Sequence, residues 1–307
     1  MARISSAMIP ASSLADISRA QQQLVEAARQ SSSQTKATDL KGYGRESQTL
    51  VSAERLVARN QSFQANAREL TTRMTIQDVA LGRAADAVSQ LKDTLFQNVS
   101  LGSGEGIRVS LNEAFEVLKG AMNTSVGGRY LFGGVMNENA PVTAASLSDL
   151  AANPLEDSIA TGEEPQFMRV EDSRTIQAGL VADDVISGAF ESLKRLTELH
   201  EGPDGPFDGP LTPTQRTALE SELQSLSAAF NNILTAQSEN GRLMKDVDNA
   251  TSRLTSQYNA LDEVIGGITN VDLAEVAVRL NQAQFAYQSS ASIFNTLRNM
   301  SLLDVLK

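Results

Sequence analysis

The sequence contains no cysteine and no tryptophan, and aromatic residues make up only 5% of its 307 residues. Without cysteine the chain can form no disulfide framework, thiolate nucleophile or cysteine-ligated zinc site. Large α/β enzymes usually have a more aromatic core, and a single histidine, His200, leaves few groups for acid–base chemistry. We therefore predict no catalytic residue, no cofactor and no metal site, and we expect that the protein is not an enzyme.

Long apolar runs are also missing from the sequence. No stretch of about 18 apolar residues occurs, so we expect no membrane insertion. The first residues lack the apolar core of a secretory signal, so we expect no cleaved signal peptide. Acidic residues outnumber basic ones by 37 to 26, and the formal net charge is −11. This excess of negative charge argues against nucleic acid as a partner.

The negative charge is concentrated in the middle of the chain. Residues 134–208 contain 15 acidic and 4 basic residues, whereas the rest of the chain contains 22 of each. An acidic segment of this kind predicts a solvated outer surface. The neutral remainder can pack against copies of itself without large repulsion.

Four stretches show apolar residues at alternating intervals of three and four, which predicts helices that pack along one stripe. The stretches are 12–33, 45–98, 212–265 and 271–306. Pro10 is expected to delay the first helix, and Thr212 and Pro213 are suited to cap and begin the third. Gly266-Gly267 is expected to end that third helix, since glycine is a weak helix former.

The two long stretches are nearly equal in length, so they are natural antiparallel partners. We predict a mainly α fold, a long antiparallel helical rod or coiled coil whose terminal helices pair, with a small irregular insert that contains short strands. Three domains follow from this arrangement. They are a terminal coiled-coil assembly domain (1–44 and 268–307), a helical rod domain (45–134 and 181–267) and an exposed acidic insert with short strands (135–180).

The terminal stripes are the candidate functional site. A helix pair this short is marginal in water, so we expect neighbouring copies to bury it. The candidate assembly residues are Leu14, Ile17, Leu24, Leu273, Val276, Leu280, Tyr287, Phe294 and Leu297. The alternative interpretation of the same periodicity is the core of an ordinary monomeric bundle. Polar residues also occupy stripe positions, where they either set the register or face solvent: Asn60, Gln77, Gln237 and Asn240.

Two parts of the sequence resemble the bacterial flagellin family. The family's C-terminal signature is similar to Val271-Asp272-Leu273-Ala274-Glu275, Gln284-Phe285-Ala286-Tyr287-Gln288 and Ser301-Leu302-Leu303-Asp304. A motif of the family's hook–filament junction members is similar to Gly128 followed by Arg129, Tyr130, Leu131, Phe132, Gly133 and Gly134. The resemblance covers about 1–134 and 212–307.

This resemblance implies a structural subunit of the bacterial flagellum that self-assembles through its terminal helices and joins the hook to the filament. The implied location is the extracellular flagellum, reached without a cleaved signal peptide. The implied partners are other copies of the chain, other hook-associated proteins, hook protein, flagellin and an export chaperone. A filament flagellin is the alternative within the family. A cytoplasmic coiled-coil adaptor or secretion chaperone, with the acidic middle as its binding face, is the alternative from another class.

Overall fold

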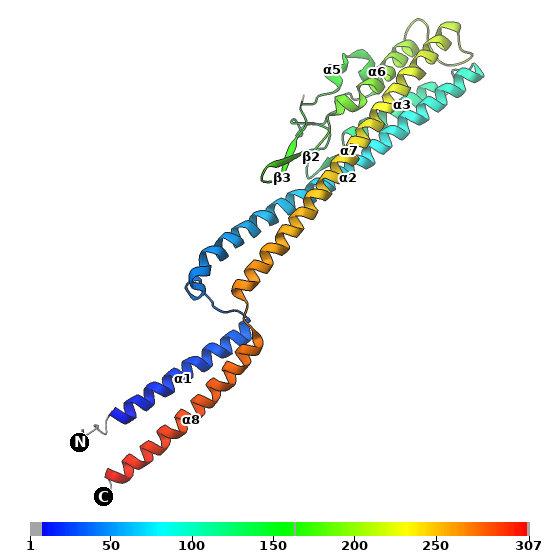
Figure 1. Ribbon diagram of the computed structural model, residues 1–307. Helices are drawn as coiled ribbons and strands as arrows, with labels where there is room; N and C mark the ends of the chain where they lie inside the picture. The colour runs from blue at the N-terminus through cyan, green and yellow to red at the C-terminus, as the bar shows by residue number, and fades with distance from the viewer. Residues whose placement is uncertain (1–7, 163, 306–307) are drawn as a thin grey trace. The chain divides into compact units, whose positions relative to one another are not determined.

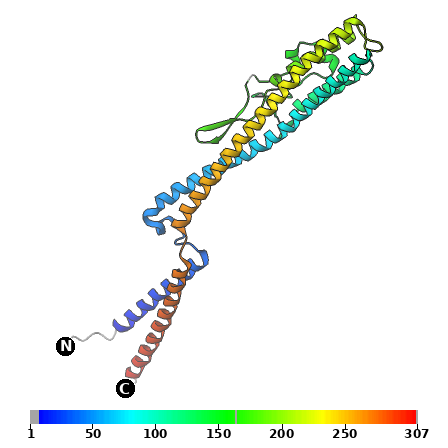
Figure 2. The same cartoon turned by 45° about the vertical axis from the view of Figure 1, so that its right-hand side comes forward.

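The computed structural model describes residues 8–162 and 164–305, and side chains within 14–296. The chain is mainly helical (Figures 1 and 2). Its helices are α1 (Met8–Ser33), α2 (Ser47–Leu101), α3 (Ile107–Met122), α4 (Leu147–Ala152), α5 (Leu155–Ser158), α6 (Ala182–Glu201), α7 (Pro213–Thr269), α8 (Leu273–Val305) and a 3₁₀ helix, Leu40–Glu46. Its strands are β1 (Ser125–Val126), β2 (Arg129–Tyr130), β3 (Phe167–Glu171) and β4 (Arg174–Gln177).

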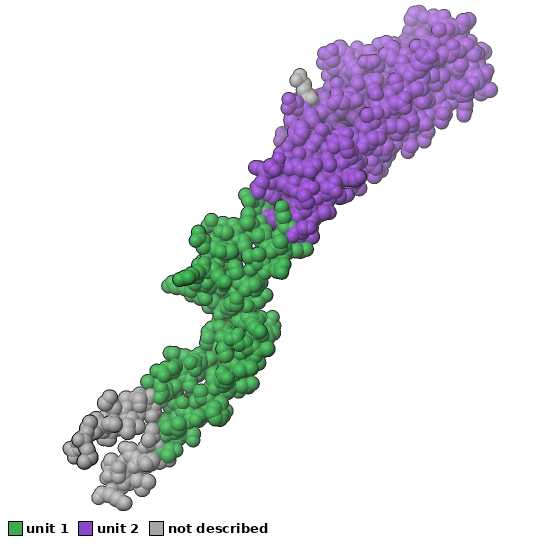
Figure 3. Space-filling model, viewed as in Figure 1, with its two compact units in different colours: residues 1–59, 257–307 green, residues 60–256 purple. Residues whose placement is uncertain are grey.

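The fold class predicted from the sequence is confirmed. The long helices α2 and α7 pair, the terminal helices α1 and α8 pair, and the strands form two small antiparallel sheets, β1–β2 and β3–β4. The chain divides into two compact units, shown in Figure 3. Unit 1 comprises residues 1–59 and 257–307, and unit 2 comprises residues 60–256. Each unit is described by itself below.

In unit 2, α2 and α7 run antiparallel, and side chains bond across them to main-chain carbonyls. The three bonds join Asn60 Nδ2 to Leu254 O (3.0 Å), Asn240 Nδ2 to Met74 O (2.9 Å) and Arg216 Nη1 to Val99 O (2.8 Å). As the residue number rises along α2, that of its partner on α7 falls by almost the same amount. The three bonds therefore fix both the direction and the register of the pair.

The core of unit 2 lies along this seam and extends into the middle of the chain. Apolar residues of α2 from Ala67 to Leu95 that lie on the predicted stripe are buried. The α3 and α6 helices add Phe115 and Phe190, whose ring centroids are 5.7 Å apart. Residues of the acidic middle belong to the same core, namely Val142, Leu147, Leu150 and Ile159. The insert is therefore folded against the long helices through an apolar contact.

The β3–β4 hairpin packs on a second apolar cluster of unit 2. Val170 and Ile176 are buried there beside Leu70 of α2 and Val247 of α7. The outer side of the hairpin is held by Arg253, whose Nε and Nη2 atoms bind the two Glu171 carboxylate oxygens at 2.8 and 3.0 Å. A two-stranded hairpin is marginal alone, so these contacts account for its stability.

Two predicted helix boundaries are wrong. Gly266-Gly267 does not end α7, which continues to Thr269, because glycine costs a helix only about 1 kcal/mol and keeps its N–H. The break comes at Asp272, whose Oδ1 accepts hydrogen bonds from the N–H groups of Ala274 and Glu275 and caps α8. Pro10 does not delay α1, which begins at Met8, because Pro10 lies in the first turn, where its missing N–H has no helical partner.

The start of α7 is confirmed. The helix begins at Pro213, and Thr212 Oγ1 accepts from the Gln215 N–H at 3.2 Å while Gln215 Oε1 accepts from the Thr212 N–H at 3.0 Å. This reciprocal pair is a capping box. The buried Gln215 side chain also donates to the carbonyl of Asp204, which attaches the loop before α7 to the helix.

Candidate assembly interface

The terminal helices α1 and α8 lie side by side and antiparallel in unit 1 (Figures 1 and 2). A clamp of main-chain contacts holds them at the end where the chain enters and leaves the pair. Thr35 forms an isolated β-bridge with Asn270, and the Lys36 N–H donates to Thr269 O at 2.8 Å. The Lys36 Nζ atom donates to Gly267 O at 2.9 Å. These contacts thus fix the position of α1 relative to α8 at this end of the pair.

Along the contact between the two helices, the buried residues are mostly small. They are Ala20 and Ala27 of α1, and Val276 and Ala283 of α8. Three of these four side chains are alanine, so the contact removes little apolar area from water. Because hydrophobic stabilisation is roughly proportional to the apolar area buried, the isolated pair is only weakly held together.

The candidate residues from the sequence lie on α1 and α8, and most remain partly open to solvent. Val276 is buried, whereas Leu14 and Leu273 are exposed. Half-buried side chains make up most of the rest, namely Ile17, Leu24, Leu280, Tyr287 and Phe294. The side chain of Leu297 lies outside the described residues. Of these candidates on the predicted stripe, the structure buries only Val276, and the others with described side chains keep area open to solvent.

A second apolar stripe on α8 escaped the sequence analysis. Val278, Phe285 and Ile293 are exposed, and Phe285 is 74% exposed. Their spacing of seven and eight residues places them on one face of the helix. The sequence analysis considered one apolar stripe for each helix. The same periodicity also contains this second stripe. An α8 helix with apolar residues on two faces has more apolar surface than α1 covers.

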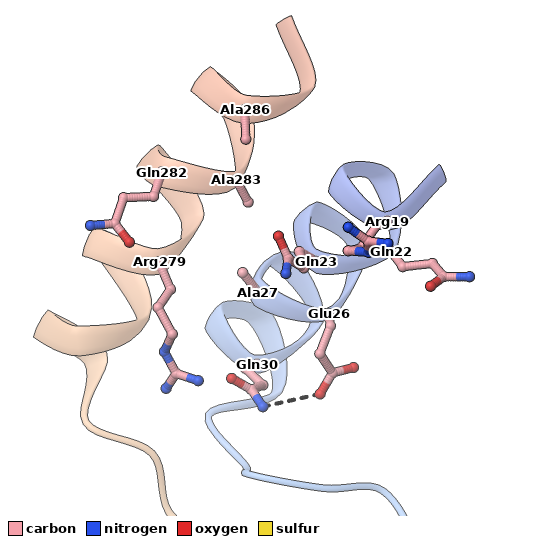
Figure 4. A pocket seen from close by; sticks show the side chains of 10 residues that line it. All are labelled: Arg19, Gln22, Gln23, Glu26, Ala27, Gln30, Arg279, Gln282, Ala283 and Ala286. Atoms are coloured by element: carbon pink, nitrogen blue, oxygen red, sulfur yellow. Dashed lines mark hydrogen bonds between the residues drawn. The ribbon is translucent and has the colours of Figure 1, made fainter. Parts of the chain in front are cut away.

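A groove of about 660 Å³ runs between α1 and α8, and Figure 4 shows the side chains that line it. Its walls are polar and come from Arg19, Gln22, Gln23, Glu26, Gln30, Arg279 and Gln282, while Ala27, Ala283 and Ala286 complete the lining. Glu26 accepts bonds from Arg29 Nη2 at 2.6 Å and from Gln30 Nε2 at 3.0 Å. The hydrogen bond from Arg29 lowers the pKa of the Glu26 carboxyl. Amide side chains dominate the groove and suit hydrogen bonding to another polypeptide.

The motif at Arg129–Gly134 lies in unit 2 and is mostly buried. Gly127 and Gly128 have φ of 60° and 79°, which forms the tight turn between β1 and β2. Leu131 and Phe132 enter the core, and Phe132 O accepts from the Ala182 N–H at 2.8 Å. Gly134 has a φ of 59°, and a Cβ there would lie 2.7 Å from Glu164 O, so only glycine fits.

This burial gives the motif a packing role within unit 2. Gln77 of α2 is buried and donates to Leu131 O at 2.9 Å. The sequence alone left open whether this stripe residue sets the register or faces solvent. Of the motif side chains, only Arg129 is exposed and Tyr130 is half-buried. The motif therefore fixes the hairpin to the long helices and leaves one cation at the surface.

Among the described residues, no group of three or more histidine, aspartate or glutamate side chains is placed to hold a metal ion. None of the helices, within the part of the chain that the structure describes, is both long and apolar enough to cross a membrane.

Comparison with known proteins accounts for this arrangement of helices. Residues 223–306, which include most of α7 and all of α8, match the bacterial flagellin C-terminal helical region. This match shows that the C-terminal helices of the chain are similar to those of bacterial flagellins. No curated protein matches the chain in sequence.

Solved structures of flagellar proteins share the fold of this chain. A crystal structure of Bacillus cereus FlgL is 18% identical, with a TM-score of 0.51, and the match covers 65% of this chain and 98% of that one. Xanthomonas campestris FlgL is 14% identical, with a TM-score of 0.55 and coverage of 70% and 99%. A candidate flagellar hook-associated protein from Vibrio parahaemolyticus is 16% identical, with a TM-score of 0.60 and coverage of 73% and 97%. The chain has the fold of the hook-associated protein FlgL.

Proposed function

We propose that this protein is the hook–filament junction subunit of a bacterial flagellum and that it assembles through α1 and α8. The observation that carries the proposal is the second apolar stripe of α8, with Phe285 74% exposed, on a helix whose other face already packs on α1. An apolar stripe of this kind on a helix is normally covered in the working state of a protein. Neighbouring copies that cover it remove a further apolar face from water.

The same proposal names the partners and the location. In addition to further copies of the chain, the partners are hook protein, flagellin, other hook-associated proteins and an export chaperone. The location is the extracellular flagellum. The terminal assembly domain (1–44 and 268–307) makes the axial contacts, and the helical rod domain (45–134 and 181–267) forms the subunit body. The acidic segment 135–180 packs on the rod through its apolar side and turns its charged side to solvent. The FlgL-like fold and the motif at 129–134 support the junction over the filament.

Replacing Phe285 tests the assembly role. Phe285→Ala removes a side chain that is largely solvated in the free subunit, so the monomer should melt as the unmodified protein does. Full burial of a phenylalanine is worth about 1.5–3 kcal/mol, and assembly should lose roughly that amount per subunit. The variant should then accumulate in the medium and leave flagella short of this subunit. Flagella with a normal content of Phe285→Ala subunits would contradict the proposal.

Phe96→Ala is the matched control, because Phe96 is 64% exposed on α2 in unit 2. It should leave the content of the subunit in flagella unchanged. Immuno-electron microscopy of isolated flagella separates the junction from the alternative, a filament flagellin. Label confined to the hook–filament boundary supports the junction, whereas label along the whole filament supports the flagellin and contradicts the junction.

A further inference from the structure

A cleft of about 470 Å³ in unit 2 lies between α2, β2 and the start of β3. Two arginines line it, Arg73 from α2 and Arg129 from β2, and neither belongs to the terminal helices. Val135 and Phe167 line the same cleft and are both exposed, Phe167 by 63%. The cleft thus combines two cations with an apolar rim on a chain whose net charge is negative.

Arg73 has hydrogen-bonding capacity that the folded subunit does not use. The residue is only 8% exposed, and its Nη2 atom donates to Gln166 Oε1 at 3.2 Å. Its Nη1 atom lies 3.8 Å from Glu69 Oε1, on a side chain that is itself 60% exposed. The Nε atom is buried without a hydrogen-bond partner. A buried guanidinium, with five N–H donors, is normally paired more fully than this.

Arg129 is exposed and makes no hydrogen bond or ion pair within the described part of the chain. Its position is fixed all the same, because the tight turn at Gly127 and Gly128 sets the β1–β2 hairpin and the buried Leu131 and Phe132 anchor its far side. Glu69 and Glu164 also line the cleft. Among the described residues, Glu69 is the only acid within ion-pairing distance of either arginine, and its 3.8 Å contact with Arg73 is long.

We infer that this cleft binds a carboxylate side chain of a second copy of this chain, an inference that rests on the proposed self-assembly. Each copy has an excess of carboxylates, with 15 acidic residues against 4 basic ones between 134 and 208. A guanidinium binds a carboxylate through two parallel N–H groups, and Arg73 and Arg129 offer two such groups. The incoming side chain displaces Glu69 from its long contact, and its methylene groups pack on Phe167 and Val135.

A photo-cross-linking amino acid at position 167 tests the inference in assembled flagella. p-Benzoylphenylalanine in place of Phe167 should cross-link to another copy of this chain, at a peptide that contains Asp or Glu. The charge reversal Arg129→Glu should reduce that product about tenfold, while Arg129→Lys should retain part of it. Glu69→Gln should increase the product, because it removes the carboxylate that competes for Arg73.

The variants at 129 keep the test independent of folding, because Arg129 is exposed and unit 2 should melt unchanged in both. A product at 167 that is insensitive to Arg129→Glu overturns the inference, as does a product with a different protein. The same cross-linker at Phe285 separates the two proposals. Intermolecular product at 285 without any at 167 overturns the cleft alone, whereas product at neither position contradicts self-assembly as well.

Discussion

Two buried asparagines hold the α2–α7 seam by bonding to main-chain carbonyls of the facing helix. Asn240 and Asn60 bind the carbonyls of Met74 and Leu254, and both side chains are buried. The sequence left open whether such residues set the register or face solvent, and for these two the structure decides for the register. Gln237, a third polar stripe residue, is half-buried.

Replacing Asn240 tests how much its bond contributes. Asn240→Ala removes a buried hydrogen bond and part of a well-packed side chain, so unit 2 should lose about 1–3 kcal/mol of unfolding free energy. Urea denaturation of the purified chain measures this loss. Asn249→Ala, at an exposed position of the same helix, is the control and should change stability by less than about 0.5 kcal/mol. Equal effects of the two substitutions would show that the bond to Met74 contributes nothing.

At the scale of the elements, the pairing of α2 with α7 makes a sharp cross-linking prediction. The three cross-helix bonds place Leu95 and Leu219 at the same level of the seam. Cysteines introduced near 95 and 219 should therefore form a disulfide readily, and the absence of native cysteine leaves no competing thiol. A pair near 70 and 219, separated along the seam, should not. Efficient oxidation of the second pair instead would contradict the register.

Acid should weaken the terminal helix α1. In the folded chain the bond from Arg29 lowers the pKa of Glu26, so the charged carboxylate stabilises the fold above the unfolded pKa of about 4.3. That stabilisation is lost as the pH falls through the lowered pKa. Helix content followed by circular dichroism between pH 6 and pH 3 should fall less in Glu26→Gln than in the unmodified chain. Glu54→Gln, at an exposed position on α2, should behave as the unmodified chain does.

The periodic elements were predictable from the sequence because each long helix buries one continuous stripe. The α2 stripe from Ala67 to Leu95 is a local pattern, and so is the start of α7 at Pro213. The end of α7 was not predictable in this way. It depends on a small difference in free energy between the cost of keeping Gly266-Gly267 in the helix and the gain from the cap at Asp272. The sequence predicts short strands within 135–180, and β3 and β4 lie there, whereas Val142 forms only an isolated bridge with Ile159.

The candidate site was predictable only in part for a related reason. The α1–α8 contact follows from heptad spacing, but the exposure of Phe285 depends on which face α1 covers. The cleft at Arg73 depends on contacts across long sequence distances, since Gln166 lies 93 residues from Arg73. Such contacts leave no periodic pattern in the sequence, so no local rule could have found them.

At the scale of the whole molecule, the apolar cores described above lie within unit 2, so a core substitution there should leave the terminal pair intact. Phe190→Ala removes a fully buried ring from unit 2 and should cost about 3–5 kcal/mol. Amide hydrogen exchange, measured as the temperature rises, should be faster across α3 and α6 and unchanged in α8. Val276→Ala, at a buried position of the terminal pair, should speed exchange in α8 and leave exchange in α3 and α6 unchanged. Equal responses of both regions to either substitution would mean that the chain unfolds as a single cooperative unit.

The two neutral asparagine bonds of the α2–α7 seam have a consequence for the medium in which the protein works. Dissolved salt screens ion pairs at a protein surface, with a Debye length of about 10 Å at 0.1 M and about 3 Å at 1 M. The bonds of Asn60 and Asn240 carry no net charge and are buried, so screening does not reach them. The register of the long helices is therefore the same in fresh water and in brine, while an outer contact such as Arg253 with Glu171 weakens as salinity rises.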